Sequence, residues 1–213
     1  SLKIVLEMHD IDPKNLDGAI IGSVVPPLTE LFQEALEKIA GIRAMVVGPG
    51  IKTGLNILMD NPAQVGSDLI VGAVAGIAEY SLPLILIDMG TATTICVIDS
   101  RKNYIGGMIL PGVRVSLDSL TSRTSQLPRI SLDAPKRLIG KNTIECMKSG
   151  VLYGNAACLD GMIDRIEADL GQEATVVATG GLAENIVPLC RHSIILDDEL
   201  LLKGLLLIYK KNA

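Results

Sequence analysis

A carboxylate, a glycine and three hydroxyl side chains follow one another where an apolar segment ends. The apolar run at 84–87 leads into Asp88, and next come Gly90, Thr91, Thr93 and Thr94. A strand would carry the Asp88 carboxylate to its tip, a glycine lets backbone approach a phosphate, and hydroxyl and N–H groups donate hydrogen bonds to phosphate oxygens. This pattern favours a site for a polyphosphate and a cation. The alternative is a plain hairpin turn, because Asp-x-Gly ends many hairpins and an apolar run returns at 95–98.

The composition limits the kinds of partner. The chain has 213 residues, of which 48% are hydrophobic, and this is enough for one large domain or two small ones. It has no Trp, one Phe and four Tyr, so it has no row of aromatic side chains on which nucleic-acid bases could stack. A net charge of −5 also disfavours a phosphate backbone as partner. We therefore expect no nucleic-acid partner.

The cysteine pattern and the hydropathy favour a cytoplasmic protein. No C-x-x-C pair and no ligand cluster with His9 or His192 is formed by the cysteines, which are Cys96, Cys146, Cys158 and Cys190. We expect buried free thiols rather than disulfides or a zinc site, and free thiols are typical of a reducing cytosol. The apolar run at 200–208 is interrupted by Lys203 and is shorter than a membrane span. We therefore expect no membrane partner.

Strands and helices are predicted to alternate in the first part of the chain. Apolar spacing and breaks at Pro or Gly predict strands at 17–25 and 43–47, and helices at 28–40 and 68–80. The segment ending at Pro83 marks a boundary.

In the second part, the order of the elements predicts the fold class. Three strands joined by short turns are expected at 84–87, 95–99 and 104–110. Helices are then expected at 113–124, 143–170, 182–190 and 198–209, with strands at 175–178 and 193–196. This is the order of a ribonuclease H-like domain. We therefore predict an α/β fold of two ribonuclease H-like domains, in which residues 1–82 are the remainder of an incomplete first domain and residues 83–213 are a complete second domain.

Six short motifs occur in a fixed order along the chain. They are Asn61-Pro62 with Gly66-Ser67-Asp68, Asp88-x-Gly90-Thr91-Ala92-Thr93-Thr94, Gly106-Gly107-x-Ile109-x-Pro111-Gly112, Thr124-x-x-Leu127-Pro128, Gly140-Lys141-Asn142-Thr143 and Thr179-Gly180-Gly181. Each motif alone is common turn chemistry, but six in one order are a specific signal. In order and spacing they resemble the type III pantothenate kinases.

The resemblance implies a fold, an activity and an assembly. The fold is that of the acetate and sugar kinase, Hsp70 and actin superfamily, with ATP and substrate in the cleft between two ribonuclease H-like domains. The activity is the ATP-dependent phosphorylation of pantothenate to 4′-phosphopantothenate, the first step of coenzyme A biosynthesis, with Mg²⁺ bound to the ATP and a monovalent cation, K⁺ or NH₄⁺. The assembly is a homodimer built by the region 113–128, and the apolar face of the helix at 143–170 is broader than one small domain requires.

The resemblance also implies roles on the substrate side. Asp68 matches the catalytic base, which would accept the proton of the primary hydroxyl of pantothenate. The set that binds pantothenate would be Gly66, Ser67, Asp68, Leu69, Thr143 and Met59. From residue type alone, Asp68 could instead be the N-cap of its helix, because Asp is a favoured cap. Thr143 could likewise cap the helix at 143–170, and for Thr143 the two roles are compatible.

On the nucleotide side, Asp88 matches the residue that binds the monovalent cation. Thr91 matches a residue that contacts ATP, and Gly180 and Gly181 match a turn between strand and helix whose backbone faces the nucleotide. The implied set that binds ATP is Gly90, Thr91, Thr93, Gly180 and Gly181.

Three departures from the family pattern leave a second function open. Nothing before Asp17 corresponds to the opening loop Asp-x-Gly-Asn-Thr, which cradles phosphates in the family, so we expect residues 1–213 alone to bind ATP poorly. Leu69 replaces an arginine and Met59 replaces a tyrosine, and each change removes a polar contact. The alternative function is a non-catalytic homologue with a binding or regulatory role. The retained Asp68 and Asp88 favour the kinase.

Overall fold

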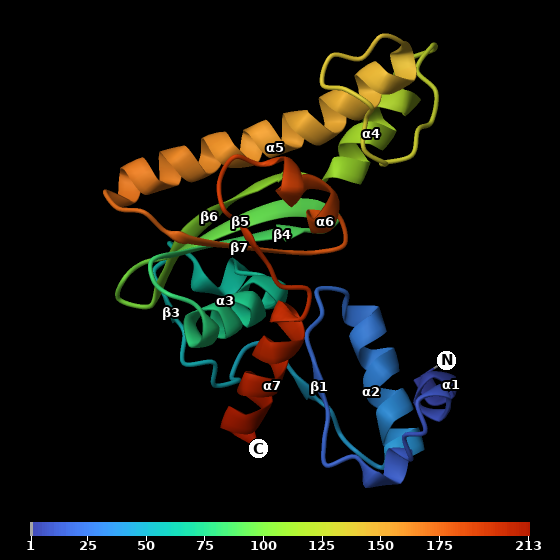
Figure 1. Ribbon diagram of the computed structural model, residues 1–213. Coiled ribbons are helices and arrows are strands. Elements are labelled where there is room, and N and C mark those ends of the chain that lie inside the picture. Colours follow the sequence, from blue (N-terminus) through green and yellow to red (C-terminus); the bar gives the residue numbers. More distant parts are fainter. Residues whose placement is uncertain (1) are drawn as a thin grey trace. The chain divides into compact units, whose positions relative to one another are not determined.

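The computed structural model describes residues 2–213 and contains two compact units (Figure 1). The first unit comprises residues up to Leu55, Asp60–Ala75 and Leu201–Ala213. The second unit comprises Asn56–Met59 and Gly76–Leu200. Residues 201–213 therefore pack with the first unit, although we assigned them to the second domain by chain order. The division into two domains between residues 82 and 83 stays a prediction.

A mixed six-stranded sheet is the centre of the second unit. Its strand order is β3-β6-β5-β4-β7-β8. β4, β5 and β6 are antiparallel, whereas β7 lies parallel to β4 and β8 parallel to β7. This is the strand arrangement that the sequence predicted for a ribonuclease H-like domain, with β3 added at one edge. The strands are β3 (Asn56–Ile57), β4 (Leu84–Met89), β5 (Ala92–Ile98), β6 (Asn103–Pro111), β7 (Thr175–Thr179) and β8 (Ile195–Leu196).

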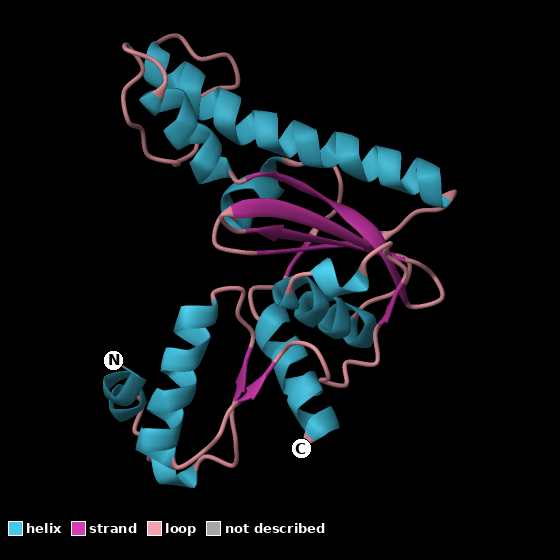
Figure 2. Ribbon diagram, turned by 180° about the vertical axis from the view of Figure 1, so that it is seen from behind, coloured by secondary structure: helices cyan, strands magenta, loops and turns pink. Residues whose placement is uncertain are grey.

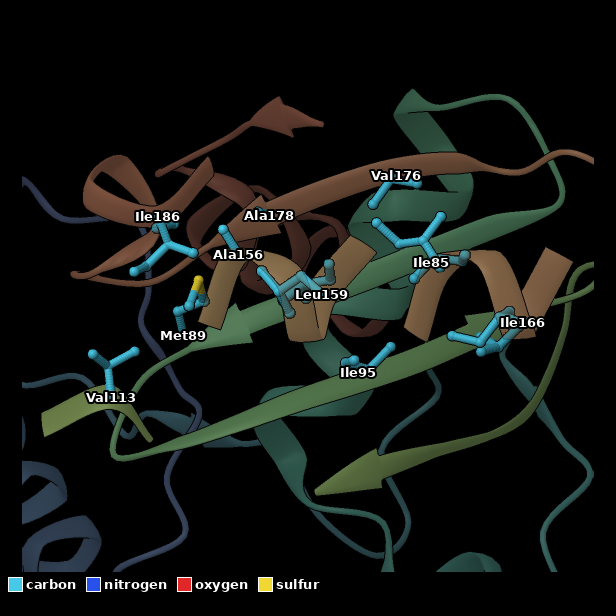
Figure 3. Packing of buried hydrophobic residues seen from close by; sticks show 14 of the residues in the cluster. Ile85, Met89, Ile95, Val113, Ala156, Leu159, Ile166, Val176, Ala178 and Ile186 are labelled. Carbon is cyan, nitrogen blue, oxygen red and sulfur yellow. The ribbon is translucent and has the colours of Figure 1, made fainter. Parts of the chain in front are cut away.

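One long helix covers one face of this sheet. α5 (Thr143–Leu170) runs along the face in both views (Figures 1 and 2). Its Leu159 and Ile166 are buried with Ile85 of β4 in one apolar cluster (Figure 3). Burying one such side chain contributes roughly 1.5–3 kcal/mol, so this contact stabilises the unit substantially. The apolar face of α5 is therefore largely used within the unit itself.

Shorter elements complete the second unit. α4 (Val113–Ser122) lies beside the first turns of α5, and α6 (Ala183–Ile186) continues into the 3₁₀ helix η3 (Val187–Leu189). On the other face of the sheet, the end of α3 (Ser67–Glu79) approaches β4 closely. A Cβ atom on Gly76 would lie 2.6 Å from Cδ2 of Leu84, so a larger residue would displace the Leu84 side chain.

The first unit is mainly helical. A small core of Val47, Val71 and Ile208 joins its elements. At Gly204, a Cβ atom would lie 2.8 Å from Cγ1 of Val71, so the last helix packs against the start of α3. The elements are α1 (Leu2–Met8), the 3₁₀ helix η1 (Pro13–Asn15), β1 (Ile20–Ile21), α2 (Pro26–Ala40), β2 (Met45–Val46), the 3₁₀ helix η2 (Pro62–Gln64), the start of α3, and α7 (Leu200–Asn212).

The strand predicted at 17–25 is shorter than expected. β1 contains only Ile20–Ile21 and pairs with β2 alone. Beyond it, the Ser23 hydroxyl accepts a hydrogen bond from the Val25 N–H at 3.1 Å, and α2 begins at Pro26. The Ser23 side chain takes up the Val25 N–H, and Pro26 has no N–H, so neither position can continue the hydrogen bonds between strands and the strand ends here.

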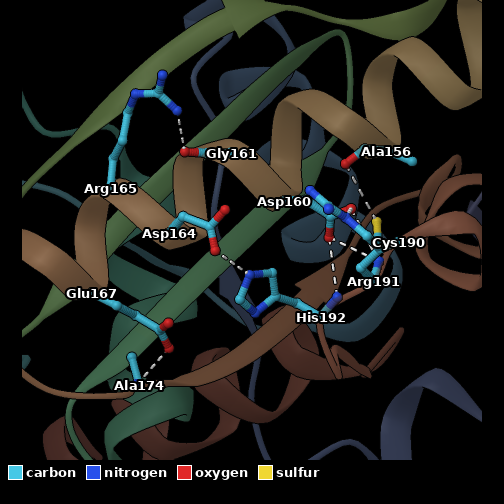
Figure 4. Close-up of polar contacts among 10 residues, drawn as sticks. All are labelled: Ala156, Asp160, Gly161, Asp164, Arg165, Glu167, Ala174, Cys190, Arg191 and His192. Atoms are coloured by element: carbon cyan, nitrogen blue, oxygen red, sulfur yellow. Dashed lines mark hydrogen bonds and ion pairs between the residues drawn. The ribbon is translucent and has the colours of Figure 1, made fainter.

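A buried carboxylate fastens the segment after η3 to α5 (Figure 4). Asp160, whose side chain is 3% exposed, accepts hydrogen bonds from the N–H groups of Arg191 (2.9 and 3.0 Å) and His192 (3.1 Å). Burial raises the pKa of Asp160, but these backbone hydrogen bonds outweigh it and hold the pKa below its usual value. Nearby, Nε2 of His192 lies 2.8 Å from Oδ1 of Asp164.

Replacing Asp160 with alanine is expected to lower the free energy of unfolding by about 2–4 kcal/mol, because it leaves two backbone donors without an acceptor. The pKa of Asp160 is depressed on folding, so its contribution is complete above the unfolded pKa and is lost as the pH falls through the folded pKa. Urea unfolding at pH 7 and at pH 3 measures both effects. Asp164→Ala, at an exposed pair, is the matched control and should cost less than about 1 kcal/mol. Equal unfolding midpoints for the two variants would contradict the assignment.

Candidate active site

The turn between β4 and β5 is the centre of the candidate site. Asp88 lies one residue before the end of β4 and is paired in register with Thr94 of β5 and Thr179 of β7. Gly90 and Thr91 form the exposed turn that follows. The predicted strand end and turn are therefore present, and both a hairpin and a ligand-facing loop fit this backbone.

Two glycines bring neighbouring segments close to this turn. Gly180, which follows β7, has φ +95°, and a Cβ atom there would lie 2.7 Å from both Oδ1 of Asp88 and N of Met89. Gly112, the N-cap of α4, has ordinary φ, but a Cβ atom there would lie 2.7 Å from the carbonyl carbon of Thr91. No other residue fits at these positions without displacing backbone.

These segments enclose a cavity of about 340 Å³. The β4–β5 turn, the start of α4 and the turn after β7 all contribute to its wall. The lining residues are Met89, Gly90, Thr91, Arg114, Val115, Asp118, Gly181 and Leu182. Three of the predicted ATP-binding residues, Gly90, Thr91 and Gly181, are therefore brought together. The volume lies in the range of small-molecule sites, and glycine N–H groups are suitable donors to phosphate.

Thr93, the remaining predicted ATP-binding threonine, does not line the cavity. Its side chain is 3% exposed, and its Oγ1 has no hydrogen-bond partner within residues 2–213. In the β4–β5 ladder Thr93 is paired with Met89, which does line the cavity. A buried hydroxyl without a partner is uncommon in a folded domain, because its desolvation is not offset.

The predicted catalytic residue lies at the start of α3, in the first unit. Asp68 is exposed in the first turn of the helix, which begins at Ser67, so Asp68 is not the N-cap. Oδ1 of Asp68 lies against the backbone of Gly66. Ser67 donates a hydrogen bond from Oγ to the carbonyl oxygen of Ser23 at 3.2 Å, which holds this turn in place. Leu69 follows, half-buried.

Thr143 belongs to a different cavity of the second unit. It is the first residue of α5 and is exposed, but the N-cap is Asn142, whose Oδ1 accepts a hydrogen bond from the Glu145 N–H at 3.0 Å. The expectation that Thr143 caps α5 was therefore wrong, because the amide side chain one residue earlier fills that position. Thr143, Lys141 and Asn142 line a cavity of about 880 Å³ between α4 and α5.

Met59, the remaining predicted pantothenate residue, groups with the second unit and not with Gly66 to Leu69. Its Sδ lies 3.7 Å from where a Cβ atom of Gly106 would be.

Sequence reasoning missed Arg114 and Asp118, which lie one turn apart on α4 and line the 340 Å³ cavity. A signal for Arg114 was present. A cation in the first turn of a helix is unfavourable, because the backbone N–H groups there are also positive.

Two further features bear on cofactors and location. Within residues 2–213, no group of three or more His, Cys, Asp or Glu side chains could hold a metal ion. None of the helices in that range has the length and apolar character that crossing a membrane requires.

The strand order is that of a ribonuclease H-like domain, with a ligand-sized cavity at the strand ends. Solved structures agree on the fold. A conserved putative Baf family transcriptional activator from Campylobacter jejuni is 20% identical, with a TM-score of 0.61 over 100% of this chain and 88% of that chain. Component A of the (R)-2-hydroxyglutaryl-CoA dehydratase of Acidaminococcus fermentans is 16% identical, with a TM-score of 0.51 over 100% and 83%.

Sequence comparison identifies the family. The family model for type III pantothenate kinase matches residues 2–165. A type III pantothenate kinase of Bacillus cytotoxicus (strain DSM 22905 / CIP 110041 / 391-98 / NVH 391-98) is 46% identical over 212 residues, which span 100% of this chain and 81% of that relative. The chain belongs to the type III pantothenate kinase family. The predicted family is thus confirmed.

Proposed function

We propose that this protein transfers the γ-phosphoryl group of ATP to pantothenate, giving 4′-phosphopantothenate in the first step of coenzyme A biosynthesis. The observation that carries the proposal is the 46% identity to a type III pantothenate kinase over the whole chain. The test is an assay of the full-length protein with Mg-ATP that follows phosphorylated pantothenate and ADP together. Release of ADP at one rate with and without pantothenate would contradict the proposal.

Asp68 is the proposed general base. Its exposed carboxylate, held in the first turn of α3, accepts the proton of the pantothenate hydroxyl. The hydroxyl oxygen then forms a bond to the γ-phosphorus, and the bond from that phosphorus to the oxygen of the departing ADP breaks. Positioning and charge stabilisation supply most of the catalysis of phosphoryl transfer.

The 340 Å³ cavity is the proposed nucleotide site. Backbone N–H groups at Gly90, Thr91 and Gly181 suit phosphate or ribose oxygens, and the Thr91 hydroxyl adds a donor. Asp88, against Gly180 at the strand end, is the proposed ligand of a monovalent cation, since carboxylate and carbonyl oxygens are what a hard cation prefers. Mg²⁺ would be bound by the ATP phosphates and would offset their charge during transfer.

Pantothenate is proposed to contact Thr143 and the turn from Gly66 to Leu69. Thr143 is exposed at the start of α5 beside Lys141, a cation suited to a carboxylate. Leu69 and Met59 offer apolar contacts where the family commonly has arginine and tyrosine. The non-catalytic alternative remains a second candidate because of these two changes. A full-length protein that binds ATP but forms no phosphorylated pantothenate would favour it.

A homodimer is the proposed assembly, and its support differs from our first expectation. The apolar face of α5 packs on its own sheet, so it does not require a partner. Exposed apolar side chains gather instead on α4, on the loop after it and on the first turn of α5. They are Val115, Leu120, Leu138, Ile139 and Ile144. The four cysteines are free thiols, which supports the proposed cytoplasmic location. The expectation that they are buried holds only for Cys96, because Cys146 is exposed and the other two are half-buried.

Sedimentation at micromolar concentration is expected to show a dimer. Ile139→Asp should yield monomers, because Ile139 is 78% exposed in the single chain and its charge would be desolvated at the interface. Leu202→Asp, at a 68% exposed position on α7, is the control and should leave the dimer intact. A monomeric wild-type protein would contradict the dimer proposal.

A further inference from the structure

Arg114 is the cationic side chain that lines the 340 Å³ cavity. It is the second residue of α4. The N-cap of α4 is Gly112, which has no side chain to cap the helix, and the first turn contains no acidic residue. The guanidinium charge therefore lies at the positive end of a helix, where it is disfavoured without an anion nearby. An anion in the cavity would relieve this repulsion and would accept hydrogen bonds from Arg114.

The start of α4, from which the exposed Arg114 side chain extends, is held in place by the backbone around it. Gly112 allows the start of α4 to lie against the carbonyls of Gly90 and Thr91, because a Cβ atom would lie 2.8 Å from the Gly90 oxygen. Gly180 likewise allows the turn after β7 to lie close to Met89, because a Cβ atom would lie 2.7 Å from the Met89 nitrogen. The β4–β5 turn, the start of α4 and the turn after β7 are thus held at fixed distances from one another, and binding a charged ligand depends on such positioning.

The charges inside the cavity do not cancel one another. Asp118 also lines it, but within residues 2–213 no ion pair joins Arg114 to Asp118.

We propose that Arg114 binds a phosphate oxygen of the nucleotide and so determines the affinity for ATP and ADP. The inference rests on the proposed function only in taking ATP as the ligand. An arginine fits this role because its planar guanidinium binds phosphate in a bidentate manner. Arg114 acts on binding and positioning, and Asp68 remains the base.

Calorimetric titration of the full-length protein with Mg-ATP, Mg-ADP and adenosine tests the proposal. Arg114→Ala is expected to weaken ATP and ADP binding by roughly 10- to 100-fold, the usual value of a charged hydrogen bond, and to leave adenosine binding unchanged. Arg114→Lys should lose less affinity than Arg114→Ala, since lysine keeps the positive charge but cannot bind phosphate in a bidentate manner. In the kinase assay, KM for ATP should rise and KM for pantothenate should not.

Arg101→Ala is the matched control, because it removes the same charge from the exposed β5–β6 turn of the same unit. Equal ATP affinity in the Arg114 and Arg101 variants would overturn the inference. An equal loss for adenosine and ATP, or a lower melting temperature with unchanged KM for ATP, would also overturn it, because the role would then be structural. A wild-type protein that binds ATP without phosphorylating pantothenate would refute the proposed function alone, and one that binds no ATP would refute both.

Discussion

Replacing Asp68 with asparagine in the full-length protein is expected to lower kcat for pantothenate phosphorylation by roughly 10²- to 10⁴-fold, the usual contribution of a general base. Asparagine keeps the shape of the side chain but cannot take a proton. Asp68 is exposed in the first turn of α3 and makes no core contact, so the fold should persist. Steady-state kinetics measure the loss, and KM for ATP should change little because the proposed nucleotide contacts are elsewhere.

The control for this prediction is Glu30→Gln, which neutralises another exposed carboxylate of the first unit on α2. Its kcat should stay within about twofold of the wild type. Thermal melting of both variants checks that they are folded. Near-normal turnover of Asp68→Asn would return Asp68 to a structural role in the first turn, where a negative charge is favoured.

Replacing Gly112 with alanine is expected to have the largest effect on the nucleotide cavity. The added Cβ would overlap the Thr91 carbonyl, so α4 must move away from the β4–β5 turn. We expect the free energy of unfolding to fall by about 1–3 kcal/mol and KM for ATP to rise at least roughly tenfold, because misplaced contacts are costly in phosphoryl transfer. Urea unfolding and kinetics at varied ATP measure the two changes.

The matched variant is Gly154→Ala in α5. A Cβ atom there meets nothing within 4 Å, and Gly154 is an exposed helical position. Alanine should therefore stabilise the protein by roughly 0.5–1 kcal/mol through its helix propensity, with unchanged KM for ATP. If Gly112→Ala behaved like Gly154→Ala, the close contact between α4 and the turn would not exist.

Local sequence patterns predicted the elements that have strong signals at both ends. The helix at 143–170 has the predicted bounds, because Asn142 caps its start and Gly171, at φ +68°, ends it. The order of three antiparallel strands and alternating helices also follows from local apolar spacing. The strand at 17–25 was predicted too long, since the number of residues that pair depends on a neighbouring strand and not on propensity alone.

The sequence by itself determined the family, the ordered motifs and the candidate residues Asp68, Asp88 and Thr143, because each lies in a short stretch whose residue types carry the signal. Only the tertiary structure decided that α7 packs with the start of α3, and that Arg114 lines the cavity containing Thr91 and Gly181. These groupings join residues that are tens of positions apart in the chain. They depend on how closely one backbone approaches another, and local periodicity carries no information about that approach.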